Sequence, residues 1–246
     1  MAVCTVDYDD FMSSRRTYAS YNDGCAAAHA LDLIGDRWTL IVVRELILGP
    51  KRFAELQRDL MGISPAILSQ RLRDLEDRSI VVRRSLPAPA RVDVYELTNW
   101  GKQLEAVNAA LSLWAVSSPE FPMDADMSPD ALVLAMRAHA RGLDSQPSPV
   151  TVRLMLTDAR LEDADPVTYT ATVGPHETTI VKTPDPGPAD AIVSATATNW
   201  KARIVGAFPL DQVSPLAIEG DASAVDALIE ATRLTALAPT AKPNPA

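Results

Sequence analysis

The 246-residue chain is 47% apolar and 22% charged, which is typical of a soluble globular protein large enough for two domains and excludes wholesale disorder. The chain lacks the run of about 18 apolar residues that a membrane span needs, and its acidic N-terminal stretch is unlike a signal peptide. Its two cysteines exclude a disulfide framework. We therefore expect a cytoplasmic protein without membrane contact. The net charge of −9 argues against nucleic-acid binding by the surface as a whole, but residues 51–91 carry 9 basic and 5 acidic side chains and form a local basic patch.

An arm and two helices are expected first. Residues 1–24 show no sustained periodicity and are interpreted as an N-terminal arm. Helical patterns follow at 25–34 and 36–48, and the second is apolar nearly all round, so we expect it inside a core. Asp36 is expected to cap this second helix, and Gly49 followed by proline marks its end.

A helix-turn-helix motif is the next prediction. A short helix at 53–60 is followed by a tight turn and by a longer helix at 65–78, with Ser64 as the N-cap and Pro65 in the first helical position. The longer helix has a stripe of leucines for burial, namely Leu68, Leu72 and Leu75. Its opposite face is free to contact DNA in the manner of a recognition helix.

A β-hairpin is expected after this helix. The stretches 80–84 and 91–97 are rich in β-branched residues, and the loop between them holds two prolines. Such a hairpin is the wing of a winged helix-turn-helix.

Thr98 is then expected to cap a helix with a narrow apolar seam. The seam residues recur at spacings of four and three: Trp100, Leu104, Val107, Leu111 and Trp114. A seam of this kind favours helix pairing between two subunits of a homodimer. Packing of the same residues within their own domain is the alternative.

The second half predicts a different domain. Residues 118–128 are rich in proline and acids and are interpreted as a linker, 129–237 as an α+β domain with a mainly antiparallel sheet, and 238–246 as a disordered tail. A helix is expected at 129–142. Strands are expected at 150–157, 167–173, 177–183, 191–194 and 214–219, and Asp221 is expected to cap a final helix.

Several motifs of the first domain recur in one group of regulators. They are the leading Cys25, D-x-I-G-x-x-W-T at 32–39, R-F-x-E-L at 52–56, I-S-P-x-x-L-S-x-R-L at 63–72 and Y-x-L-T-x-x-G at 95–101. Through these motifs the segment resembles the HxlR family of bacterial winged-helix regulators. The resemblance implies a winged helix-turn-helix over 25–117 and a homodimer that binds a palindromic operator in double-stranded DNA.

The expected DNA contacts fall into two groups. Gln70 and Arg73 are assigned to base readout, because glutamine can bond adenine and arginine can bond guanine through paired hydrogen bonds. Ala66, Ile67 and Ser69, beside the capping Ser64, are candidates for minor base contacts. Phosphate contacts are assigned to Arg52, Arg71, Arg83, Arg84 and Arg91. The alternative is that single arginines are only solvated or paired with Asp74, Glu76 and Asp77.

Cys25 is a candidate redox sensor. The resemblance implies this role, since some members of the family sense electrophiles or oxidants through a cysteine at this place. A reactive thiol needs a lowered pKa, which the start of a helix can supply. The alternative is a small buried packing residue.

The second domain resembles sterol carrier protein-like domains in its last third. The shared features are a short strand, a helix leading to a glycine before Pro-Leu-Asp, an I-x-G-D step at 218–221 and a closing helix. The resemblance implies an apolar tunnel for a hydrophobic small-molecule effector. Its candidate lining residues are Trp200, Phe208, Leu210, Ile218, Leu228 and Ile229. A filled core made of the same residues is the alternative.

No catalytic centre is expected. His29, His139 and His176 are dispersed, without metal-ligand spacing, and no glycine-rich phosphate loop occurs, so neither a metal nor a cofactor is expected. The leading hypothesis is a homodimeric repressor controlled by a hydrophobic ligand. A carrier of lipid-like molecules that uses the winged helix only to dimerise is the main alternative, and an enzyme that does the same is a third.

Overall fold

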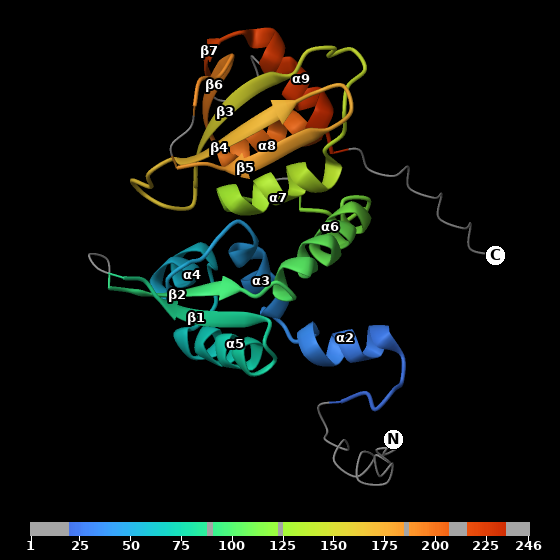
Figure 1. The fold of residues 1–246 in the computed structure, drawn as a ribbon, viewed down its shortest axis with the longest axis vertical. Coiled ribbons are helices and arrows are strands. Elements are labelled where there is room, and N and C mark those ends of the chain that lie inside the picture. Colours follow the sequence, from blue (N-terminus) through green and yellow to red (C-terminus); the bar gives the residue numbers. More distant parts are fainter. Residues whose placement is uncertain (1–19, 88–90, 123–124, 185–186, 207–215, 235–246) are drawn as a thin grey trace, which may run out of the picture. The chain divides into compact units, whose positions relative to one another are not determined.

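The computed structural model describes residues 20–87, 91–122, 125–184, 187–206 and 216–234 (Figure 1). The described residues form two compact units. One holds those up to residue 46 together with Pro50–Gly101, and the other holds Ile47–Gly49 and those from residue 102 onward. Most of the expected arm, the expected tail, Phe208 and Leu210 lie outside the described residues.

The first unit has the element order expected of a winged helix-turn-helix. In chain order its elements are α2 (Ala26–Ile34), α3 (Thr39–Ile47), α4 (Phe53–Asp59), α5 (Pro65–Asp77), β1 (Val81–Ser85) and β2 (Asp93–Leu97). The helix-turn-helix prediction is therefore confirmed, with α4 and α5 as its two helices.

The helix α5 forms where the sequence predicts it. The Ser64 hydroxyl accepts a hydrogen bond from the N–H of Ile67 at 3.3 Å, and Pro65 occupies the first turn. The expected leucine stripe is buried to 1% exposure or less. Burying these three leucine side chains stabilises the domain by about 1.5–3 kcal/mol each. Because this stripe faces the core, the opposite face of α5 faces solvent.

The start of α3 differs from the expectation. The helix begins at Thr39, and Asp36 contributes its backbone carbonyl, which accepts the N–H of Thr39 at 3.1 Å. The Asp36 side chain instead pairs with Arg71 on α5. Trp38 has a φ of +78°, an unusual value for a bulky residue. Its indole ring comes within 3.9 Å of the position that a Cβ would take on Gly62 in the α4–α5 turn.

The wing is an antiparallel pair whose register runs from Val81 opposite Leu97 to Ser85 opposite Asp93. Lys51, just before α4, forms a β-bridge to Tyr95 in β2, with N–H···O distances of 3.1 and 2.8 Å in the two directions. Backbone bonds thus attach the wing to the loop that precedes the helix-turn-helix.

The second unit combines helices with a five-stranded sheet. Its elements are α6 (Leu104–Ala115), α7 (Pro129–His139), β3 (Val150–Thr157), β4 (Val167–Val173), β5 (Thr178–Lys182), β6 (Ala191–Thr196), α8 (Ala197–Gly206), β7 (Ala217–Gly220) and α9 (Ala222–Thr232). The strand order is β5-β4-β3-β6-β7, and among the strands that the structure describes only β3 and β6 pair in parallel. The prediction of an α+β domain with a mainly antiparallel sheet is confirmed.

The core of this unit lies between one face of the sheet and α7, α8 and α9 (Figure 1). Trp200 of α8 is fully buried there and its Nε1 lies 3.3 Å from the sulfur of Met136. Leu228 is also fully buried in this core. Of the residues expected to line a tunnel, these two therefore follow the filled-core alternative.

The segment before α7 is held against α8. Lys201 donates to the carbonyl oxygens of Pro122 at 3.1 Å and Ala125 at 2.7 Å, and its Nζ lies 5.8 Å from the ring centre of Phe121. The Thr198 hydroxyl donates to Asp126. We call residues 121–122 and 125–127 the strap. The expected linker is thus in part a packed element of the second unit.

Candidate nucleic-acid interface

The exposed face of α5 carries the residues assigned to base contact. Ala66, Ile67, Gln70 and Arg73 are exposed, and Ser69 is half-buried. The turn that aims this face contains Gly62 at a φ of +88°, a conformation that glycine adopts without steric cost. The helix-turn-helix therefore presents the expected side chains together on one side.

Gln70 joins the polar groups of this face into one network. Its amide nitrogen donates to Asp74 at 2.7 Å, and its amide oxygen accepts from Arg73 at 2.7 Å. The two side chains assigned to base readout are therefore bonded to each other in the free protein.

Arg71 does not belong to this face. Its side chain is 19% exposed, and its guanidinium pairs with Asp36 and, at 3.3 Å, with Asp74. These carboxylates hold it against the segment before α3, so its geometry is that of a structural ion pair rather than of the phosphate contact expected for it.

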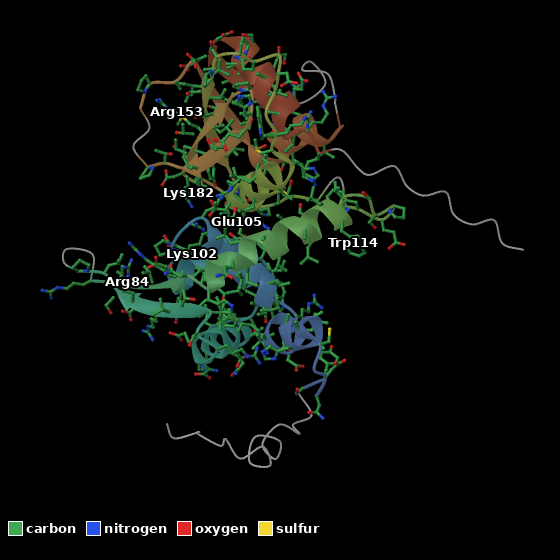
Figure 2. All side chains as sticks on the ribbon, turned by 45° about the vertical axis from the view of Figure 1, so that its right-hand side comes forward. Arg84, Lys102, Glu105, Trp114, Arg153 and Lys182 are labelled. Atoms are coloured by element: carbon green, nitrogen blue, oxygen red, sulfur yellow. The ribbon has the colours of Figure 1, made fainter. Side chains whose placement is uncertain are left out.

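The wing arginines are paired across the hairpin. Arg83 bonds Asp93, and Arg84 lies 2.9 Å from Glu96; Figure 2 shows Arg84 on the hairpin. Hydrogen bonds from the Ser85 hydroxyl and from Arg83 lower the pKa of Asp93, so this carboxylate is charged at neutral pH. Arg83 and Arg84 therefore follow the alternative expectation, in which the arginines are paired with carboxylates. Their partners lie on the opposite strand and are not the acids expected from the sequence.

Three of the arginines assigned to DNA contact have no carboxylate partner in the described part of the chain. Within the part of the chain that the structure describes, Arg52, Arg73 and Arg91 make no ion pair, and all three are exposed. Arg52 stands at the N-terminus of α4, where its backbone N–H donates to Glu55 at 2.6 Å. Arg52 and Arg91 are the best placed of the set to neutralise phosphates, whereas Arg73 stands on the face assigned to base readout.

Sequence reasoning missed a charged cluster beneath the interface. Lys51 lies 2.8 Å from both Glu45 and Asp59, and the Glu45 side chain is 0% exposed. Arg44 and Arg58 bind the second oxygens of the two carboxylates, each at 2.8 Å. The available signal was Glu45 within a helix made mostly of apolar residues, since a carboxylate in such a place needs a cationic partner.

Cys25 stands at the N-terminus of α2, and the alternative of a buried packing residue is wrong because the thiol is exposed. The backbone N–H groups of Ala28 and Ala27 lower the pKa of Cys25. A thiolate is the nucleophilic form of cysteine, so the geometry provides for reactivity.

The helix α6 has an exposed apolar face. No residue of α6 is buried, and Val107, Leu111 and Trp114 are exposed while Leu104 is half-buried. Trp114 reaches 77% exposure and projects from the helix in Figure 2. Trp100, which precedes α6 in the other unit, is also exposed. The Thr98 hydroxyl accepts the N–H of Gly101 at 3.0 Å and so caps the short 3₁₀ turn Gly101–Gln103, whereas α6 itself begins after Gln103, whose side chain makes no capping bond.

Among the residues that the structure describes, no cluster of histidine, cysteine or acidic side chains is arranged to hold a metal ion. In the same residues no helix has the length and apolar character needed to cross a membrane.

The fold and this face define a winged helix-turn-helix protein. A profile of the HxlR-like helix-turn-helix family matches residues 33–120. The Bacillus subtilis HTH-type transcriptional regulator YodB is 40% identical over 87 residues, which are 35% of this chain and 77% of YodB. YvaP, an uncharacterised HTH-type transcriptional regulator from the same organism, is 37% identical over 87 residues, 35% of this chain and 80% of YvaP. The chain belongs to the HxlR-like helix-turn-helix family.

Solved structures of relatives match the chain as well. The reduced form of YodB from B. subtilis is 36% identical, covers 39% of this chain and 95% of its own, and has a TM-score of 0.36.

Proposed function

We propose that this protein is a DNA-binding transcriptional regulator that acts as a cytoplasmic homodimer on a palindromic operator. The observation that carries the proposal is the exposed face of α5, where Gln70 and Arg73 stand on a capped recognition helix. The names of the relatives support the same class. The proposal assigns no catalytic step to the chain.

The dimer is supported by α6. An apolar seam left exposed on a helix costs free energy in water, and pairing it with a second copy removes that surface. A two-fold dimer would present two copies of α5, as a palindromic site requires.

Repression and control by ligand complete the proposal. We place the hydrophobic effector on the second unit, which is a separate compact fold, and its binding there would change the affinity of the first unit for the operator. The effector must bind the two states of the dimer differently to act. The exposed Cys25 thiol, with its lowered pKa, is proposed as a second, redox input.

Binding to a duplex from the gene's own upstream region tests DNA recognition. Fluorescence anisotropy between 50 and 200 mM salt should show an affinity that falls steeply as salt rises. If the duplex is not bound at the lowest salt, the proposal fails.

Two variants separate base readout from phosphate contact. Arg73→Ala should relax the preference for the operator by about 1–3 kcal/mol, whereas Arg91→Ala should weaken binding to all sequences alike. Arg71→Ala is the matched control on the same helix, because Asp36 and Asp74 already hold its guanidinium. Equal effects of the first two changes would contradict the assignment.

Mass spectrometry of the natively purified chain tests the effector. An apolar molecule carried by the second unit supports control by ligand, and truncation after residue 122 should then abolish the response to it. If a duplex never binds and an apolar passenger is always present, the chain is a carrier instead.

A further inference from the structure

A cavity of about 410 Å³ opens on the second unit where two strands and a helix meet. The register places Met155 of β3 opposite Ser194 of β6 and Thr157 opposite Thr196, at the carboxyl ends of this parallel pair of strands. The chain turns directly from β6 into α8 at this point. The lining residues are Met155, Thr157, Pro166, Ser194, Ala195, Thr196 and Asn199.

The lining combines apolar surface with neutral hydrogen-bonding groups. Met155 and Pro166 supply the apolar part, and Ser194 and Asn199 supply a hydroxyl and an amide. None of the lining side chains is charged. Because an ion without a counter-charge is costly to desolvate, this cavity favours an uncharged molecule. Its volume lies within the range of small-molecule sites.

The same helix connects the cavity to the strap. Thr196 accepts the N–H of Asn199 at 3.1 Å, so the first turn of α8 forms one wall of the cavity. Thr198 and Lys201 lie on either side of Asn199 in α8. They bind the strap, Thr198 through Asp126 and Lys201 through the carbonyls of Pro122 and Ala125.

The strap continues from α6. The helix ends at Ala115, and the chain reaches the strap within a few residues. An ion pair of 2.6 Å between Glu105 and Arg137 also joins α6 to α7. The first turn of α8 that forms the cavity wall, the strap and α6 are therefore connected in series within one compact unit.

We propose that this cavity is an effector site for a small uncharged molecule with an apolar body and a hydrogen-bonding end, such as a neutral amide or alcohol. Occupancy moves the first turn of α8, and through Lys201 and Thr198 it moves the strap and α6. The proposal rests on the proposed function only where it takes α6 as the dimer helix. The site itself stands on the cavity and its lining.

Benzamide is the probe for the site, since its ring matches Met155 and Pro166 and its amide matches Ser194 and Asn199. Titration of the full ¹⁵N-labelled chain should give saturable amide shifts at Met155, Ser194 and Asn199, with a Kd on the order of 1 mM for so small a ligand. Benzoate, which has the same shape and a negative charge, should bind at least tenfold more weakly.

Two tryptophan variants locate the binding. Ser194→Trp fills the cavity from an exposed position and should weaken benzamide binding at least tenfold. Thr179→Trp, on the exposed edge strand β5 away from the cavity, is the matched control and should bind like the natural chain. Benzamide shifts that persist in Ser194→Trp, or an equal preference for benzoate, overturn the proposal.

Hydrogen exchange tests the coupling. In the natural chain, saturating benzamide should change exchange at least twofold in residues 104–127. In Lys201→Met that change should vanish while the shifts at Ser194 remain. Thr198→Val, which removes only the bond to Asp126, should reduce it in part and serves if Lys201→Met does not fold. Unchanged exchange in the natural chain overturns the coupling.

Operator binding by the same samples separates the two proposals. If benzamide binds and the duplex does not, the proposed function fails and the site stands. If the duplex binds and benzamide does not, the site fails and the proposed function stands.

Discussion

Replacing Lys51 by methionine should destabilise the winged-helix unit more than any surface change. The ammonium group lies 2.8 Å from both Glu45 and Asp59, whose side chains are 0% and 9% exposed. Methionine keeps the length of the lysine stem and removes its charge. Two buried carboxylates then face each other without the cation between them.

The size of the loss follows from what remains. Breaking a buried ion pair by removing one partner costs about 3–5 kcal/mol. Arg44 and Arg58 still bind one oxygen of each carboxylate, although Arg58 is 57% exposed and its pair is screened by water. We therefore expect a loss near the lower end, about 3 kcal/mol.

Native-state hydrogen exchange of peptides from α3 and α4 measures this loss in the first unit alone, because exchange reports opening locally. The control is the triple variant Glu45→Gln, Lys51→Met and Asp59→Asn, which removes the buried charges together and should regain most of the stability. A loss below about 1 kcal/mol, or a triple variant no more stable than the single one, would refute the assignment of a buried, charged cluster.

Three further changes test other features. Asp93→Asn should free Arg83 for phosphate and raise affinity for all duplexes at low salt, with no change in sequence preference; unchanged affinity would show that the hairpin stays clear of DNA. In a Cys4→Ser background, the pH midpoint for alkylation of Cys25 by iodoacetamide should lie below that of the same chain in urea, because unfolding removes the helical N–H groups that lower its pKa; equal midpoints would contradict this. Leu111→Glu should raise the dimer dissociation constant about 100-fold in sedimentation. The control is Leu113→Glu, which should not raise it, because Leu113 has a similar exposure (41% against 45%) but lies on another side of α6. Equal effects would contradict the assignment of the seam as the dimer contact.

Local signals explain what could be predicted from the sequence. Ser64, Pro65 and the leucine stripe determine α5 within a dozen residues, so its bounds and its exposed face followed from spacing and capping. The hairpin and the cap at Thr98 depend on equally short stretches.

The missed features depend on contacts between distant residues. The partners of Arg83 and Arg84 follow from the strand register, which sequence does not show. Asp36 has the character of an N-cap, but Arg71, far along the chain, takes its side chain. From the sequence alone the strap is interpreted as a linker, because Lys201, which binds it, lies about 80 positions later in the chain.

If α5 reads bases as proposed, the bond between Gln70 and Arg73 competes with the operator for these two side chains in the free protein. Gln70 offers Arg73 an amide oxygen in place of the guanine oxygen that DNA would offer, and Asp74 occupies the Gln70 amide in place of adenine. A cognate sequence replaces both bonds at little net cost. A wrong sequence replaces neither bond, so Arg73 would keep its hydrogen bond to Gln70 at most sites in the genome. The regulator thereby gains selectivity by weakening its attraction to the many sites that it must ignore.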